Sequence, residues 1–152
     1  MKAHKSPLVL NDFLLLRSNY QFIQPEKPNF KIGEIMDKYP IDLDFTVRRI
    51  QDNLFHLFTK IQINHESKSL PGYVLFIEGV SLFSFDEKAS LSEEDKANLL
   101  HYSGLNITIN SFRNILATLT ANGPFNKYTL PSIDVNKLLH DKQIQLKNKK
   151  QS

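Results

Sequence analysis

The chain has 152 residues, 41% of them hydrophobic and 23% charged, and it carries a formal net charge of +3 with an isoelectric point near 9.0. These values are typical of one globular domain, so we expect a single domain over residues 1–152, with a core at about 8–146 and a basic tail at 147–152. The absence of cysteine excludes disulfides and thiolate metal sites and suits a cytoplasmic protein. No apolar run approaches the roughly 20 residues needed for membrane insertion.

The first half of the chain alternates with the period of two that indicates β-strands. Strands are expected over residues 8–23, 41–50, 54–65 and 73–85, with a hairpin turn at 51–53. The last of these strands is apolar on both faces, so we expect both of its faces to be covered. We predict neither a helix nor a strand for the connection "KIGEIMDKYP" that precedes the second strand.

The second half changes to helical spacing. Ser92, followed by acidic residues, is a good helix start, and Ser103-Gly104 is expected to break or kink that helix. A long helix is expected from about Asn106 up to the stop signal Asn122-Gly123-Pro124, with Gly123 in the left-handed conformation. A last helix follows, capped by Ser132 or Asp134.

The order of elements predicts an α+β fold: a four-stranded antiparallel sheet followed by a long helix and a C-terminal amphipathic helix packed on one face. The sheet and the long helix carry more apolar surface than one layer of helices can cover. We therefore expect a homotetramer, or at least a dimer. The residues assigned to the interface between copies share one stripe of the long helix: Ile109, Phe112, Leu116 and Leu119.

The sequence offers little catalytic chemistry. The histidines are scattered without zinc-site spacing, namely His4, His56, His65, His101 and His140. Asp42 and Asp44 share a strand face, which is read more simply as a solvated outer face than as a catalytic pair. We therefore expect no enzyme, no cofactor and no metal, although a pocket that clustered His56, His65 and Glu78 would revive an enzyme.

The segment "GPFNKYTLPSID" places aromatic and apolar residues between the two helices without a helical pattern. It carries Phe125, Tyr128, Leu130 and Pro131. Because non-helical segments usually run over the surface, we expect this arm to be mobile and partly exposed. Such a surface suits a protein that binds other polypeptides.

From about Leu10 to Lys142 the chain resembles SecB, the bacterial protein-export chaperone, and its SecB-like relatives. The resemblance rests on "SLFSF" at the end of a strand, the break "YSGLN", the long helix "INSFRNILATLTANG", the arm and the closing helix "VNKLL". It implies a dimer of dimers with the sheets outside and the long helices sandwiched between them. It also implies an ATP-independent holdase for unfolded preproteins or other client polypeptides, acting in protein export and translocation.

In the resembled family the arm and the last helix overlie the sheet and help to form an apolar groove that receives unfolded polypeptide. Exposed apolar surface without precise hydrogen-bond readout fits a protein that accepts many sequences. The alternative is that the matching residues form the core of the monomer. The positions matching the client groove are Ile41, Leu43, Phe45, Phe125, Tyr128, Leu130, Ile133 and Leu138.

The resemblance also implies docking on the SecA motor through carboxylates, and here the chain departs from the family. The matching positions are Asn19, Ile23 and Phe76, all uncharged, although Glu78 lies nearby on the same strand. This departure favours another partner, such as that of a SecB-like chaperone in a toxin–antitoxin system.

A nucleic-acid-binding domain is the remaining alternative. Arg48, Arg49 and Lys60 could form a small basic stripe, but acidic residues interrupt it, so we expect no nucleic-acid partner. The lysines of the tail could contact a polyanion, yet a solvated and frayed terminus is the simpler expectation.

Overall fold

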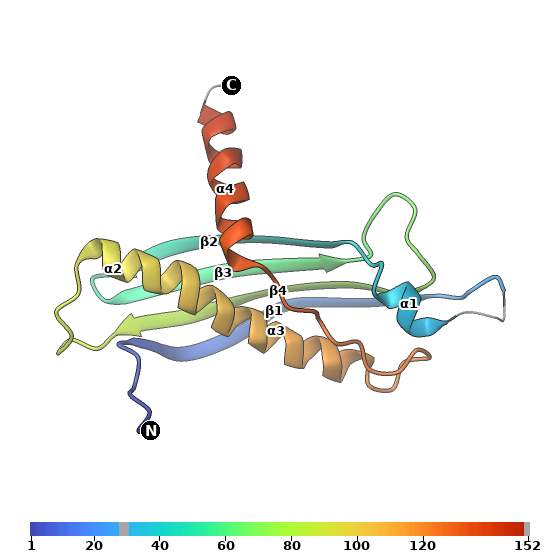
Figure 1. Cartoon of the computed structure of the whole chain (residues 1–152), viewed down its shortest axis with the longest axis horizontal. Helices are drawn as coiled ribbons and strands as arrows, with labels where there is room; N and C mark the ends of the chain where they lie inside the picture. The colour runs from blue at the N-terminus through green and yellow to red at the C-terminus, as the bar shows by residue number, and fades with distance from the viewer. Residues whose placement is uncertain (28–30, 151–152) are drawn as a thin grey trace.

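The computed structural model describes residues 1–27 and 31–150, with only the backbone of Lys150 (Figure 1). Residues 151 and 152 of the predicted tail lie outside the described residues. The elements are β1 (Leu8–Ile23), α1 (Ile32–Met36), β2 (Ile41–Gln51), β3 (Leu54–Ile63), β4 (Gly72–Phe85), α2 (Glu93–Asn98), the π-helical turn η1 (Leu99–Gly104), α3 (Leu105–Thr120) and α4 (Val135–Lys150).

The four strands form one antiparallel sheet, as predicted, and the structure gives their order as β1-β4-β3-β2. β4 lies inside the sheet, which agrees with its apolar character on both faces. Phe83 of β4, for example, lies opposite Leu10 of β1 and Phe55 of β3. β1 and β2 form the two edges.

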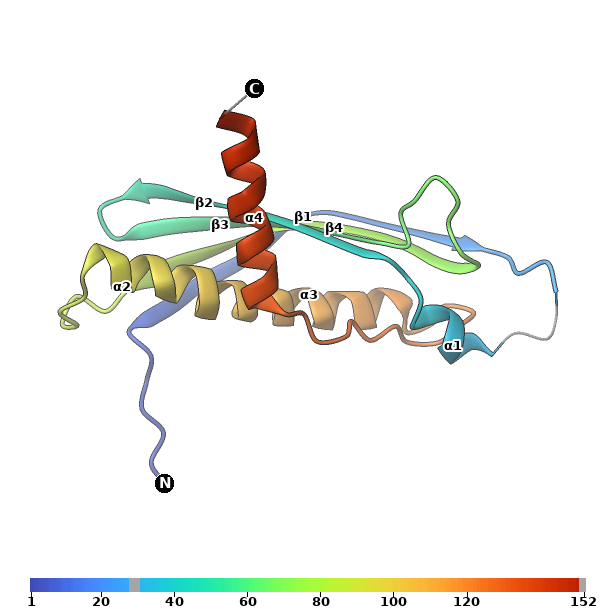
Figure 2. The ribbon, with the colours of Figure 1, turned by 45° about the horizontal axis from the view of Figure 1, so that its top comes forward.

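The helices of the second half cover one face of this sheet (Figures 1 and 2). Ser92 and Asp95 form the capping box that starts α2. The break expected at Ser103-Gly104 does not occur: α2 continues through η1 into α3, because the π-helical turn absorbs the irregularity. Gly104 packs on Phe83 there, and a Cβ at this glycine would lie 3.4 Å from the ring.

The apolar stripe of α3 packs on the sheet of its own chain. Ile109, Phe112 and Leu116 are 3%, 0% and 0% exposed, whereas Leu119 is half-buried. Phe112 meets Phe13 of β1 edge-to-face, with 5.7 Å between the ring centroids. The sheet of the same chain therefore occupies the first three side chains, and the role of the stripe in an interface between copies stays a prediction.

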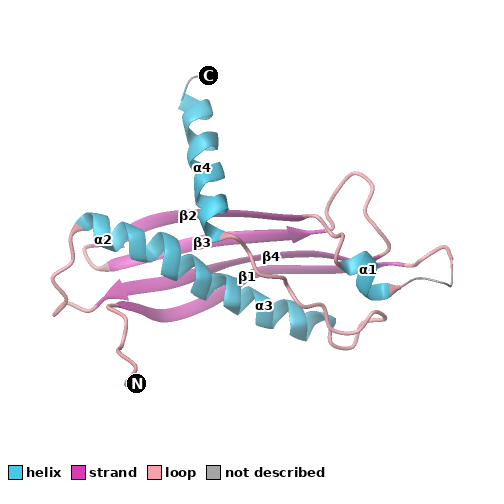
Figure 3. Cartoon of the chain, viewed as in Figure 1, coloured by secondary structure: helices cyan, strands magenta, loops and turns pink. Residues whose placement is uncertain are grey.

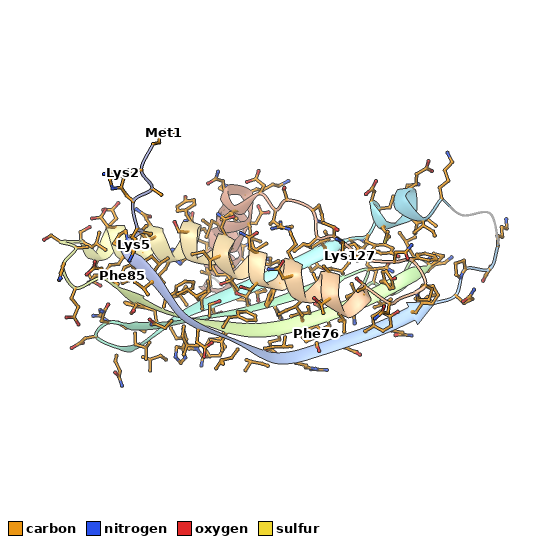
Figure 4. All side chains as sticks on the ribbon, turned by 90° about the horizontal axis from the view of Figure 1, so that it is seen from below. Met1, Lys2, Lys5, Phe76, Phe85 and Lys127 are labelled. Atoms are coloured by element: carbon orange, nitrogen blue, oxygen red, sulfur yellow. The ribbon has the colours of Figure 1, made fainter. Side chains whose placement is uncertain are left out.

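The other face of the sheet has no element over it within the described part of the chain (Figure 4). The expectation that both faces are covered is therefore wrong for the single chain. Val74 and Val80 on this face are shielded only by their neighbours on the strands. The β1 edge beside it carries Leu14, Leu15 and Leu16, which are 44–52% exposed.

The last helix begins over the covered face and then projects past β2 (Figures 1 and 2). Asp134 caps it: its Oδ1 accepts a hydrogen bond from the N–H of Lys137 at 3.0 Å. The helix continues to Lys150, so the described part of the basic tail is helical rather than frayed. Beyond the middle of the helix its apolar side chains are exposed, Ile144 at 45% and Leu146 at 50%.

Candidate functional site

The arm, residues 121–134, joins α3 to α4 as a loop (Figure 3). The hydroxyl of Tyr73 on β4 accepts a hydrogen bond from the N–H of Phe125 at 3.0 Å and donates one to the carbonyl of Asn126 at 2.7 Å. A Cβ on Gly123 would lie 2.4 Å from that hydroxyl, so the close approach requires glycine. The left-handed conformation predicted for Gly123 is instead taken by Asn126, with φ of 59°.

The second half of the arm is held by α3. The hydroxyl of Thr120 accepts a hydrogen bond from the N–H of Tyr128 at 2.8 Å. The guanidinium of Arg113 donates to the carbonyls of Leu130 and Pro131 at 3.0 and 3.3 Å. Polar groups on the sheet and on α3 therefore bind the arm backbone along much of its length.

The arm side chains are buried, which overturns the expectation of a mobile and partly exposed segment. Phe125, Tyr128 and Leu130 are 7%, 3% and 1% exposed. Phe125 meets Phe22 of β1 and Tyr73 of β4 in edge-to-face contacts, with centroid distances of 5.1 and 6.1 Å. Burial of this apolar surface, together with the paired backbone, explains why the arm packs as core.

The other predicted groove residues lie in the same apolar cluster. Phe45 is 6% exposed, and the half-buried members are Ile41, Leu43, Ile133 and Leu138. The structure therefore brings all eight residues together, mainly as core. Their role in binding a client stays a prediction.

Open space lies beside these residues rather than among them. One cavity of about 260 Å³, which we call the α1–arm cavity, separates α1 from the arm. It is lined by Gly33, Met36, Asp37, Tyr39, Ile41, Lys127, Tyr128, Thr129 and Pro131. The helix α1, which forms one wall of this cavity, was not predicted from the sequence. The spacing of Ile32, Ile35 and Met36 is nevertheless that of a helical turn.

A second cavity of about 330 Å³, the α4–β2 cavity, lies between the edge strand and the projecting helix. It is lined by Phe45, Thr46, Val47, His101, Leu139, Lys142, Gln143 and Leu146. Burial lowers the pKa of His101, whose ring meets Phe45 at a centroid distance of 6.2 Å. At neutral pH this imidazole is therefore mainly uncharged, and the charge in the lining is that of Lys142.

Lys142 ties α4 to the edge of the sheet. Its ammonium pairs with the carboxylate of Asp44 and lies 5.6 Å from the centroid of the Phe45 ring. Partial burial raises the pKa of Asp44, but the hydrogen bond and charge of Lys142, together with smaller effects, outweigh it, so the net pKa lies below its usual value. This pairing, with Lys60 nearby, supports the reading of Asp42 and Asp44 as an outer face rather than a catalytic pair.

His56 and Glu78, two of the three residues whose clustering would have revived the enzyme alternative, do not meet. His56 lies opposite Leu82, whereas Glu78 lies opposite Lys60, four residues further along β3. Four strand residues span about 13 Å. Within residues 1–27 and 31–150, no group of three or more acidic or histidine side chains could hold a metal ion.

The uncovered face carries a row of alternating charges across all four strands. Arg17, Glu78, Lys60 and Asp44 are successive cross-strand partners. The neighbouring row includes Asn19 opposite Phe76, two of the uncharged positions matched to the SecA dock. The four charges neutralise one another, so they create no strong field for a basic partner.

No family model and no curated protein matches the sequence. Among solved structures, a SecB-like chaperone of Mycobacterium tuberculosis, in complex with a peptide from an antitoxin, is similar with a TM-score of 0.54 and 17% identity. The match covers 84% of this chain and 91% of that one. The chain has a SecB-like fold.

A protein of unknown function from Streptococcus agalactiae is similar at 10% identity, over 82% of this chain and 97% of that chain, with a TM-score of 0.43. The arm and the start of α4 lie over one face of the sheet, as the resemblance implied (Figures 1 and 2). None of the described helices is long and apolar enough to cross a bilayer.

Proposed function

We propose that this chain is an ATP-independent chaperone that holds unfolded segments of client polypeptides beside β2. The observation that carries the proposal is the pair of cavities that the SecB-like fold forms there, one beside the arm and one beneath α4. The peptide bound to the mycobacterial SecB-like chaperone supports a polypeptide as the ligand. The apolar part of the walls, which includes Met36, Ile41 and Leu139, suits clients of varied sequence.

Binding would be passive. Burial of apolar surface supplies roughly 25 cal/mol per Å², and the cost of ordering the client offsets part of it. The purified protein should therefore suppress aggregation of reduced α-lactalbumin, followed by light scattering, without nucleotide. Suppression that depends on ATP hydrolysis by this chain, or no suppression at stoichiometric excess, would refute the proposal.

The assembly we propose is a homotetramer built as a dimer of dimers. The β1 edge supports contact between copies, because apolar side chains that stay exposed on an edge strand favour association. Its exposed members are Val9, Leu10, Leu14, Leu15 and Leu16. The α3 stripe would contribute mainly by supporting this sheet from within the chain.

We propose that the partner that receives the client is not a basic, SecA-like docking domain. Asn19, Ile23 and Phe76 lack the carboxylates expected there, and the row beside them is neutral. The antitoxin peptide in the mycobacterial complex favours the second candidate, a cytoplasmic chaperone of a toxin–antitoxin pair. Titrating the protein with SecA and with an antitoxin segment distinguishes export from this alternative.

A further inference from the structure

The hydroxyl of Tyr128 is buried without a partner. Only two buried side-chain polar atoms in the described part of the chain make no hydrogen bond, this hydroxyl and that of Thr59. Tyr128 is 3% exposed and lines the α1–arm cavity. Since a buried hydroxyl without a partner is unfavourable, its retention beside a cavity points to a partner that arrives from outside.

A second tyrosine in the same cavity provides the contrast. The rings of Tyr39 and Tyr128 lie with 6.0 Å between centroids and 31° between planes. The Tyr39 hydroxyl donates to the carbonyl of Pro71 at 2.8 Å and accepts from the N–H of Tyr73 at 3.0 Å. The folded chain therefore supplies hydrogen-bond partners for the Tyr39 hydroxyl but none for the Tyr128 hydroxyl.

The two walls of the cavity differ in how firmly they are held. The arm wall is fixed through Thr120 and Arg113. The α1 wall is a five-residue helix with no fully buried residue, held on the core by the half-buried side chains of Ile32, Ile35 and Met36. A Cβ added at Gly33 in this helix would meet nothing within 4 Å, so open space adjoins the wall there. A ligand can therefore reach the hydroxyl by displacing α1 rather than the arm.

The hydroxyl is protonated at physiological pH and can act as a donor. Burial, with smaller effects from Tyr39 and the charge of Asp37, raises the pKa of Tyr128 to about 12. The complementary acceptor is a neutral oxygen, because the lining carries both the carboxylate of Asp37 and the ammonium of Lys127 and so favours neither sign of added charge. The peptide carbonyl is the one such acceptor that every polypeptide carries.

We propose that the Tyr128 hydroxyl donates a hydrogen bond to a backbone carbonyl of a client segment that enters the α1–arm cavity. The inference rests on the proposed function. It adds one hydrogen bond, which we call the anchor, to the apolar contacts that the α1–arm cavity offers a client. A cavity of about 260 Å³ accommodates one side chain and the peptide group beside it. Because the anchor contacts the backbone, it adds affinity without narrowing the range of sequences.

The test compares four tyrosine and glycine variants for binding to reduced, carboxymethylated α-lactalbumin and for melting. Tyr128→Phe should weaken binding about fivefold, as for one hydrogen bond, yet melt at or above the wild-type temperature. Gly33→Leu should weaken binding without lowering the melting temperature. Tyr39→Phe should lower the melting temperature, and Tyr102→Phe, on an exposed ring, should change neither quantity.

The outcomes separate this inference from the proposed function. If the wild type does not bind the probe, the proposed function fails. If the wild type binds and Tyr128→Phe binds equally well, only the anchor is overturned. A lower melting temperature for Tyr128→Phe also overturns it, because the hydroxyl would then already have a partner such as an ordered water. Unchanged binding by Gly33→Leu overturns entry through this cavity.

Discussion

Removing the hydroxyl of Tyr73 should release the arm. Tyr73→Phe keeps the ring and its packing but deprives the N–H of Phe125 and the carbonyl of Asn126 of their partner. An unsatisfied buried backbone group costs about 1–3 kcal/mol. Phe125 is buried and bears this cost in full, whereas Asn126 is exposed and its carbonyl can turn to water. The expected loss of stability is therefore about 1–3 kcal/mol.

Thermal and chemical unfolding of the variant measure this loss. For a chain of this length the melting temperature should fall by roughly 2–12 °C. Tyr20→Phe is the matched control: its ring lies 5.6 Å from that of Tyr73, and its hydroxyl makes no hydrogen bond within the described residues. If Tyr73→Phe unfolds within about 0.5 kcal/mol of Tyr20→Phe, the hydroxyl does not hold the arm and our account of its burial is wrong.

Leu116→Ala should cost about 2–5 kcal/mol in denaturant unfolding, because the side chain is fully buried; a smaller loss would mean that α3 is loosely packed. The pKa of Asp44 lies below its ordinary 3.8, so the stability contributed by its pair with Lys142 is present above that pH and is lost as the pH falls through the folded-state pKa. Lys142→Gln should reduce this acid dependence by at most about 1 kcal/mol, because Asp44 is 46% exposed and the N–H of Phe45 and Lys60 still lower its pKa. An unchanged acid profile contradicts the pairing. Light scattering should show about four times the 17.6 kDa chain mass, and Leu16→Lys on the β1 edge should reduce it; a monomer at micromolar concentration contradicts the assembly.

The sheet was predictable because its signal is local. Alternation at period two marks each strand, and β1 runs from Leu8 to Ile23 as expected. The apolar character of β4 on both faces agrees with its place inside the sheet, although the sequence did not predict the order of the strands. Spacing also revealed the covered side of α3, from Ile109 to Leu116.

The arm could not be placed by the same reasoning. Its sequence resembles a surface loop, and the groups that bind it lie elsewhere in the chain. Tyr73 is 52 residues from Phe125, and Arg113 is 17 residues from Leu130. No local pattern announces such pairings, because they depend on how β4 and α3 approach each other in space.

The burial of the arm changes which experiment can separate a client groove from a core. Truncating Phe125 and Tyr128 to alanine removes two buried aromatic side chains, and each costs about 3–5 kcal/mol of stability. Weaker client binding by that double variant would therefore follow from partial unfolding alone. Tyr128→Phe deletes a single oxygen that the folded chain leaves unpaired, so stability and affinity should move in opposite directions or affinity alone should fall. Only a site that binds an incoming acceptor predicts that combination, and a residue with a purely structural role does not.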